Sequence, residues 1–487
     1  MPGRERPEIF WELTRSLCPT CRKVVDAQIL LRDGRVYMRK RCSDHGWFEA
    51  LIFGDADLYA RIAPYNKPGT LPLKFTTEVR EGCPHDCGLC PEHRQHTCLA
   101  VMEINSGCNL DCPLCFAGSG THLARNGFEL TSQEVGFMLD RFVETEGDPE
   151  VLQLSGGEPT LHPQLLDFVS MAQDRGIRHV MVNTNGLRLA HDDRLLTGFQ
   201  RLKPTVYLQF DGFDPATTLS LRGRDDLLEH KLRTLERCAE ADVRVVLVSA
   251  IEAGVNEHEV GAIVRFGIGH PAVFGVNFQP AFRAQRHLAA DPMTRMTIPD
   301  LLRHVELQTA GMFRLDDFVP VPCCMPTCNF VTYALLDGQA VTPITRLIDV
   351  ESHLDYLKNR TLPSLDEELA KTLERLWSSS APVGSTQNAA DVHRAIGSCP
   401  ACHARLPLSN HSSADMARHI FMVNTRDFMD PWTFNVKNVM KCCVEFLVPD
   451  GRMIPFCAYN SVGYREQVMA GLNGRPSQPP RAVPARR

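Results

Sequence analysis

Three cysteines in one short segment give the sequence its clearest chemical signal. Cys108-Asn-Leu-Asp-Cys112-Pro-Leu-Cys115 directly follows the apolar run LAVMEI. Three thiolates can bind three irons of a [4Fe–4S] cluster, whereas complete ligation by protein takes four cysteines. The remaining iron is then open to chelate the amino and carboxylate groups of a small molecule. A zinc loop with a distant fourth ligand is the alternative, but it does not explain why the segment opens a series of strands and helices.

A second group of cysteines precedes this segment. Four thiols in a short span are enough to complete the ligation of a [4Fe–4S] cluster, and they are Cys83, Cys87, Cys90 and Cys98. Tetrahedral zinc is the competing occupant, since it also accepts four sulfur ligands. We favour a second iron–sulfur cluster because the group lies directly beside the three-cysteine segment.

The N-terminal region holds another set of candidate metal ligands. Cys18-Pro-Thr-Cys21 and Cys42-Ser-Asp-His45 flank the β-type run RVYMRK. A CxxC pair followed by a CxxH pair is typical of a tetrahedral Cys3His site. Zinc would make the site structural and iron would make it a rubredoxin-like electron-transfer site, and we expect structural zinc. If His45 is not a ligand, the fourth must come from elsewhere, for example from Cys399 or Cys402.

The C-terminal half adds eight cysteines, two pairs of which are adjacent in the chain: Cys323, Cys324, Cys328, Cys399, Cys402, Cys442, Cys443 and Cys457. Because adjacent cysteines rarely both ligate one ion, we predict a third cluster that uses one member of each pair. Its predicted ligands are Cys323, Cys328, Cys443 and Cys457. Buried free thiols or a zinc site are the alternatives.

Alternating strands and helices must position these ligands. From residue 99 to about residue 282, the apolar runs LAVMEI, VLQLSG, HVMVNTNG, TVYLQFDG, VRVVLVSA and VFGVNFQP alternate with amphipathic stretches such as QLLDFVSMAQDRG. Alternation at this spacing predicts right-handed βαβ units and a parallel sheet, open or partly closed into a barrel. The predicted fold class is therefore α/β. Cys238 lies in the helical run LRTLERCAEA and is expected to be a small buried hydrophobe.

The predicted organisation has five parts. Residues 1–65 form a Cys/His metal-knuckle domain, 66–98 an auxiliary cluster segment and 99–285 the α/β core. Residues 286–465 form a C-terminal auxiliary-cluster domain. The Pro/Arg-rich end, 466–487, is expected to be a disordered tail.

Composition excludes several classes of protein. The chain has 487 residues and a formal net charge of −6, which gives no general attraction to nucleic acid. No apolar run has the length of a membrane span, and the first residues lack the apolar stretch of a signal peptide. Nineteen clustered cysteines in an apparently cytosolic chain favour metal binding over disulfides.

The segment CNLDCPLC resembles the CxxxCxxC motif of the radical S-adenosylmethionine (SAM) enzymes. One βα unit later, Ser155-Gly156-Gly157-Glu158-Pro159 is similar to the GGE motif of that superfamily, whose backbone and glutamate hold the methionine amino group of SAM. The glycines would permit close approach of the backbone to the ligand. By the same resemblance, polar residues at the ends of later strands should contact SAM, namely Asn183, Asn185, Gln209, Asp211 and Ser249.

This resemblance implies a partial (βα)6 radical SAM barrel with small Cys-rich metal-binding domains at both ends. The cluster at Cys108, Cys112 and Cys115 would cleave SAM reductively to a 5′-deoxyadenosyl radical, which then abstracts a hydrogen atom from an unactivated carbon. Flavodoxin or ferredoxin is the expected type of electron donor. One or two auxiliary [4Fe–4S] clusters and a mononuclear zinc or iron complete the expected cofactors.

Three segments resemble a narrower group: SLCPTCRKVVDAQI, CPEHRQHTCLA and PDGRMIPFCAYN. They are similar to the archaeal tetraether lipid synthase and to pterin-directed radical SAM methyltransferases. The first hypothesis is carbon–carbon bond formation between lipid alkyl chains by a cytoplasmic enzyme that contacts the membrane peripherally. The second is radical C-methylation of a pterin or another small molecule. A non-enzymatic zinc scaffold is the third, and the GGE-like motif in its expected place argues against it.

Overall fold

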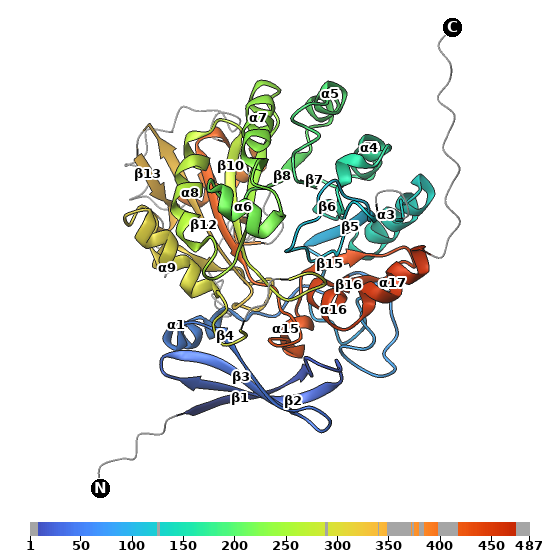
Figure 1. Cartoon of the computed structure of the whole chain (residues 1–487), viewed down its shortest axis with the longest axis vertical. Helices are drawn as coiled ribbons and strands as arrows, with labels where there is room; N and C mark the ends of the chain where they lie inside the picture. The colour runs from blue at the N-terminus through green and yellow to red at the C-terminus, as the bar shows by residue number, and fades with distance from the viewer. Residues whose placement is uncertain are drawn as a thin grey trace.

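The N-terminal part of the chain is a separate antiparallel sheet. The computed structural model describes residues 8–123, 127–287, 291–338, 340–347, 372, 375–378, 384–397 and 417–473. The first four strands pair in chain order and lie at the bottom of Figure 1 in blue. They are β1 (Ile9–Leu17), β2 (Val24–Arg32), β3 (Arg35–Cys42) and β4 (Gly46–Phe53), and α1 (Ala56–Ile62) follows. The β1–β2 and β3–β4 connections lie at the same end of this sheet, because the strands are antiparallel.

The centre of the molecule is a run of six parallel strands, as the sequence predicts. They pair in chain order as β5 (Leu99–Asn105), β6 (Val151–Gly156), β7 (His179–Thr184), β8 (Thr205–Gln209), β9 (Val245–Ile251) and β10 (Val273–Pro280). Parallel neighbours require crossover connections, and helices provide them. The strands and helices form the α/β partial barrel expected above.

The crossover helices lie along the outside of the curved sheet (Figure 1). They are α3 (Ser132–Glu146), α4 (Leu165–Gln173), α5 (Asp193–Leu202), α6 (Pro215–Arg222), α7 (Leu227–Glu240) and α8 (Val260–Gly269). A capping box between Thr131 and Glu134 begins α3, because each side chain accepts a hydrogen bond from the backbone of the other. Cys238 is buried on the inner side of α7, as expected for a small core residue.

Strands from the C-terminal half extend the same sheet at both edges. At one edge β14 (Ile420–Arg426) pairs parallel with β10, and β12 (Asn329–Asp337) pairs antiparallel with β14. At the other edge β15 (Val444–Leu447) pairs parallel with β5 and antiparallel with β16 (Met453–Pro455). Two short strands flank β12, namely β11 (Val319–Pro320) and β13 (Ala340–Pro343). The predicted C-terminal segment is therefore joined to the core by main-chain hydrogen bonds.

The remaining helices of the described residues are α9 (Ile298–Gln308), α12 (Thr386–Gly397), α15 (Val436–Val439), α16 (Phe456–Ser461) and α17 (Tyr464–Asn473). The last helix corrects one prediction, since residues 466–473 were assigned to a disordered tail. Arg465 is 2% exposed and its guanidinium pairs with Glu103, which anchors α17 against β5. Residues 474–487, Cys399 and Cys402 lie outside the described residues. None of the helices in the described part of the chain has the length and apolar character that crossing a bilayer requires.

Candidate active site

The three-cysteine segment lies at the carboxyl ends of the central strands, directly after β5. Main-chain hydrogen bonds hold it in place, because the Cys108 N–H donates to Gly120 O and the Cys115 N–H donates to Arg286 O, at 3.3 and 2.9 Å. The side chains of Cys108, Cys112 and Cys115 all line one cavity inside the barrel. Strand carboxyl ends are where parallel α/β folds build their sites, so the position agrees with the predicted chemistry.

The chemistry of these thiols fits an iron–sulfur group. Burial, with the nearby Glu158 carboxylate, raises the pKa of Cys108 to about 12, and burial also raises the pKa of Cys112 above its usual value. The Cys108 and Cys112 thiols therefore stay protonated unless a cation compensates the thiolates. A metal group supplies that positive charge and deprotonates its thiol ligands.

The glycines of the GGE-like motif line the cavity and also pack closely against the backbone around this segment. A Cβ added to Gly156 would lie 2.2 Å from Asn105 O, and one added to Gly157 would lie 2.1 Å from Gly107 O. The Gly157 N–H donates to Asn105 O and the Glu158 N–H donates to Gly107 O, both at 2.9 Å. The glycines therefore permit close approach to the strand end that carries the cysteines, and their approach to a ligand stays a prediction.

Glu158 is 1% exposed and joins the ends of two strands. Its carboxylate accepts hydrogen bonds from the Thr160 and Thr184 hydroxyls at 2.5 and 2.7 Å. The backbone N–H groups of Thr160 and Asn185 donate to the same carboxylate at 3.1 and 2.8 Å. Burial raises the pKa of Glu158, and these hydrogen bonds oppose the rise. Glu158 consequently fixes the end of β7 beside the cysteine segment.

The predicted SAM-contacting residues divide into two groups. Ser155, Asn183, Asn185 and Gln209 line the cavity together with the motif glycines. Asp211 and Ser249 do not, and both are fully buried. The Asp211 carboxylate instead accepts two hydrogen bonds from Arg222, at 2.7 and 2.8 Å, and the Ser249 hydroxyl donates to Phe210 O. Their side chains point into the packing between strands and helices, and their contact with SAM stays a prediction.

Two cationic residues of the site were not predicted. Arg222, at the end of α6, lines the cavity, donates to Leu114 O at 3.0 Å and is held by Asp211. Lys231 of α7 is 1% exposed, and its Nζ donates to Gln209 O and Gln209 Oε1 at 2.6 and 2.8 Å. Burial lowers the pKa of Lys231 to about 8. Both are ordinary helix residues in the sequence, and only their helical placement against the strand ends makes them part of the site.

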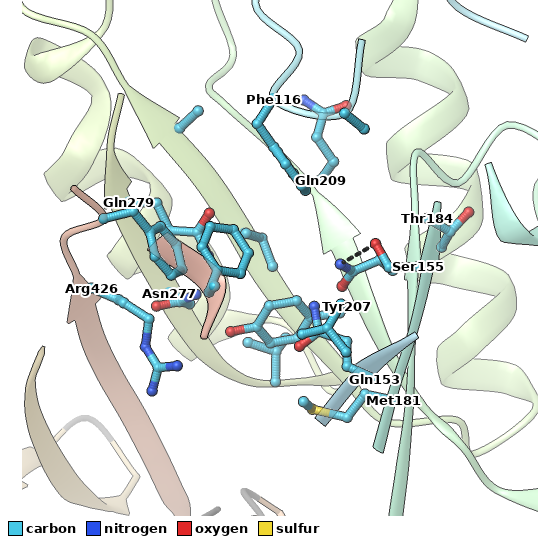
Figure 2. A pocket seen from close by; sticks show the side chains of 18 of the residues that line it. Phe116, Gln153, Ser155, Met181, Thr184, Tyr207, Gln209, Asn277, Gln279 and Arg426 are labelled. Carbon is cyan, nitrogen blue, oxygen red and sulfur yellow. Dashed lines mark hydrogen bonds between the residues drawn. The ribbon is translucent and has the colours of Figure 1, made fainter. Parts of the chain in front are cut away.

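Away from the cysteines, the cavity lining combines several carboxamides with a larger apolar surface. It has a volume of about 280 Å³ and includes Gln153, Asn277, Gln279, Asn329 and Asn424. The side chains of Gln153, Tyr207, Asn277 and Gln279 surround it in Figure 2, with Phe116 at the end nearest the cysteine segment. The Asn424 Nδ2 group donates to Asn277 Oδ1 at 2.7 Å. Alternate residues of each strand face this space, so polar and apolar side chains share its lining.

The N-terminal ligands meet as predicted. Cys18, Cys21, Cys42 and His45 place one ligand atom each within 4.8 Å of the others. The Cys21 and Cys42 sulfurs are 3.8 Å apart, and His45 Nδ1 is 3.5 Å from the Cys42 sulfur. Tetrahedral zinc with Zn–S bonds of about 2.3 Å requires sulfur atoms about 3.8 Å apart. The four atoms therefore fit a tetrahedral zinc ion.

The remaining thiols group differently from the prediction. Cys98 lies with Cys323 and Cys443 rather than with Cys83, Cys87 and Cys90, and the Cys323 and Cys443 sulfurs are 3.6 Å apart. The reason is strand pairing, because the Cys98 N–H donates to Cys443 O at 3.0 Å where β5 meets β15. Spacing along the chain does not show this contact.

The other predicted ligands line two small cavities. Cys83, Cys87 and Cys90 share one with His93. A second is lined by five thiols from three segments: Cys324, Cys328, Cys442, Cys443 and Cys457. Thus Cys328, Cys443 and Cys457 do come together, as predicted for a third cluster, whereas Cys323 belongs to the group of Cys98. Cys324 and Cys442 also line this cavity and were not predicted.

Comparison with known proteins agrees with this arrangement. A model of the radical SAM superfamily matches residues 102–267, and one of the HMPTM N-terminal zinc ribbon domain matches residues 10–54. The 7,8-dihydro-6-hydroxymethylpterin dimethyltransferase of Methanocaldococcus jannaschii is 34% identical over 489 residues, covering 93% of this chain and 94% of that protein. This chain belongs to that family of radical SAM enzymes.

Other known proteins match shorter parts of the chain. The GTP 3′,8-cyclase of Haemophilus influenzae is 31% identical over 128 residues, which cover 25% of this chain and 35% of that protein. Among solved structures, Streptococcus suis SuiB aligns with a TM-score of 0.36 and 14% identity, over 45% of this chain and 47% of that one.

Membership in the radical SAM superfamily makes the chain an enzyme that uses a [4Fe–4S] cluster and SAM. The zinc ribbon match and the grouped thiols indicate further metal sites. The sequence motifs were interpreted first in terms of lipid chain coupling, and these comparisons do not support that interpretation. They favour the alternative, a methyltransferase.

Proposed function

We propose that this radical SAM enzyme methylates a carbon atom of a pterin or a closely related heterocycle. The observation that carries the proposal is the set of carboxamides in the cavity lining, including Gln153, Asn277, Gln279 and Asn424. Each carboxamide offers both hydrogen-bond donors and acceptors, as does the edge of a pteridine ring. The name of the relative that matches along almost the full chain points to the same substrate class.

The cofactor end of the cavity is assigned to the residues that line it there. Cys108, Cys112 and Cys115 hold the [4Fe–4S] cluster, and Ser155, Asn183, Asn185 and Gln209 contact SAM. When bound, the reduced cluster and SAM supply a 5′-deoxyadenosyl radical that removes a hydrogen atom from carbon. Lys231 orients Gln209 through two hydrogen bonds, and Glu158 holds the backbone at Asn185. These positioning groups are themselves buried, so they need no rearrangement when SAM binds.

The remaining metal sites support this centre. The N-terminal set holds a structural zinc ion, and the grouped thiols hold one or two auxiliary clusters. A small redox protein such as flavodoxin or ferredoxin supplies electrons.

The test is anaerobic turnover of iron-replete protein with SAM and dithionite. We expect 7,8-dihydro-6-hydroxymethylpterin to stimulate 5′-deoxyadenosine formation, and membrane lipid extract to leave it unchanged. Cys112→Ala is the control, and it should abolish 5′-deoxyadenosine while the other metal sites stay filled. Stimulation by lipid and not by pterin would reject the proposed substrate, and 5′-deoxyadenosine from the Cys112→Ala protein would reject the proposed cluster site.

A further inference from the structure

One cation in the cavity is not compensated by the residues around it. Arg426 ends β14, lines the cavity and is labelled in Figure 2 beside Asn277. Within the part of the chain that the structure describes, its guanidinium has no hydrogen-bond or ion-pair partner. Arg222, by contrast, also lines the cavity but pairs with Asp211. A desolvated guanidinium without a partner is costly unless a ligand completes its hydrogen bonds.

A second polar group is unpaired beside it. Asn329 of β12 is the antiparallel partner of Arg426 in the sheet, lines the same cavity and is 2% exposed. Its Oδ1 atom has no hydrogen-bond partner among the described residues. Arg426 and Asn329, at paired positions of β14 and β12, therefore present five guanidinium N–H donors and one free acceptor, Asn329 Oδ1, to the same cavity.

Arg426 also forms part of a wall between two sites. Asn329, Arg426, Phe428, Val444 and Phe456 line both the main cavity and the five-thiol cavity that contains Cys324 and Cys443. Tyr207 and these thiols are the groups whose negative charge would raise the pKa of Arg426. One alternative role of Arg426 is therefore to compensate the negative charge of the thiolates. That role requires only a positive charge near the thiols, whereas binding a ligand requires the planar guanidinium.

We propose that Arg426, with Asn329, is the specificity-determining pair of the substrate site and binds the edge of a pteridine ring through the planar guanidinium. This inference rests on the proposed function. Two parallel N–H groups of Arg426 donate to the ring carbonyl at C4 and to the adjacent N5, while Asn329 Oδ1 accepts from an N–H of the ligand. The same fork geometry reads the O6 and N7 atoms of guanine, which have the same arrangement as the C4 carbonyl and N5 of a pterin.

The oxidation state of the ring follows from this contact. In a 7,8-dihydropterin N5 is an imine nitrogen and accepts a hydrogen bond, whereas in a tetrahydropterin N5 carries a hydrogen and is a donor. The N5–H group of a tetrahydropterin would face an N–H group of Arg426. That N–H group would then be buried without an acceptor. The enzyme should therefore bind dihydropterins and discriminate against tetrahydropterins.

The experiment measures binding without turnover. Iron-replete protein with SAM and no reductant is titrated anaerobically by equilibrium dialysis with 7,8-dihydro-6-hydroxymethylpterin and with its 5-deaza analogue, which lacks the N5 acceptor. We expect Arg426→Lys and Arg426→Gln to weaken binding of the dihydropterin by about 10- to 100-fold. The wild-type protein should show a similar loss with the 5-deaza analogue, and the variants should no longer distinguish the two ligands.

Arg418→Gln is the matched control, because its side chain is 71% exposed just before β14, and its affinity should equal that of the wild type. Iron content of the Arg426→Lys protein separates the two roles, since lysine keeps the positive charge but not the fork. Unchanged iron with weakened pterin binding supports the proposal. Wild-type affinity in Arg426→Lys overturns it in favour of a counter-charge. Loss of iron in that variant also overturns it, because the weakened binding would then follow from a damaged metal site. If the wild-type protein binds no pterin, the proposed function fails instead.

Discussion

At the residue scale, buried polar side chains hold the cofactor end of the cavity in one geometry. Lys231, Arg222 and Glu158 direct their hydrogen bonds to strand ends and to the cysteine segment. His162, three residues after the GGE-like motif, does the same, because its Nε2 donates to Leu130 O at 3.0 Å and its Nδ1 accepts from the Gln164 N–H. Such residues are neutral or paired because an uncompensated buried charge is strongly unfavourable.

His162 gives a pH dependence whose sign can be worked out. Burial lowers its pKa to about 4, below the 6.5 of the unfolded chain, so the unfolded state binds more protons between these values. Stability is therefore lost as the pH falls from 6.5 toward 4. Between pH 7.5 and 5.5, we expect the free energy of unfolding of the His162→Gln protein to fall by about 1 kcal/mol less than that of the wild type. Anaerobic urea unfolding measures this difference. Equal losses in the two proteins would show that His162 is not the titrating group.

At the scale of elements, the site depends on how closely the end of β6 approaches the end of β5. Gly156 has φ +135°, and no side chain fits at either motif glycine without displacing main-chain oxygen atoms. The cysteine segment is consequently held by the next strand of the sheet as well as by its own loop. One methyl group added at Gly156 or Gly157 should therefore disturb the metal site, although neither glycine is a metal ligand.

Gly157→Ala tests this contact. The added Cβ would meet Gly107 O at 2.1 Å, so the segment must shift and we expect a loss of about one cluster, ~4 iron atoms per chain. Gly269→Ala is the matched control, since nothing lies within 4 Å of a Cβ there, at the end of α8. Iron analysis and melting temperature measure both effects. Full iron content in the Gly157→Ala protein would contradict the assigned role of the contact.

At the scale of the whole molecule, the cysteine groups are completed by segments far apart in the chain. The C-terminal half supplies β14 at one edge of the sheet and β15 at the other, and the N-terminal sheet packs against the chain that joins them. Lys40 is 1% exposed in that interface. Its Nζ donates to Ser16 Oγ, Pro431 O and Trp432 O at 2.9, 2.7 and 2.8 Å.

Lys40→Met should loosen the N-terminal sheet from the barrel. Removal of the ammonium leaves two buried carbonyls without this donor, and we expect a loss of about 1–3 kcal/mol. Hydrogen exchange of residues 9–53 and urea unfolding measure the effect. Lys23→Met is the control, because Lys23 is 66% exposed and pairs with Asp44 on the surface. Equal stability of the two variants would refute the anchoring role.

The sequence by itself determined the features that depend on short spacing. The CxxxCxxC segment, the CxxC and CxxH pairs and the alternation of six strands with helices are local patterns, and the structure keeps them together. Side chains at strand ends were partly predicted, because Asn183, Asn185 and Gln209 line the cavity, whereas Asp211 and Ser249 do not. One face of a strand end cannot be told from the other without its packing.

Only the tertiary structure decided how the remaining residues are grouped. Cys98 meets Cys443 through the pairing of β5 with β15, across 345 positions of the chain, and Arg426 meets Asn329 through the pairing of β14 with β12. Such partners are set by the register of strands that are distant in the sequence. Helix residues such as Arg222 and Lys231 reach the site for the same reason, because the packing of their helices determines which strand ends they contact.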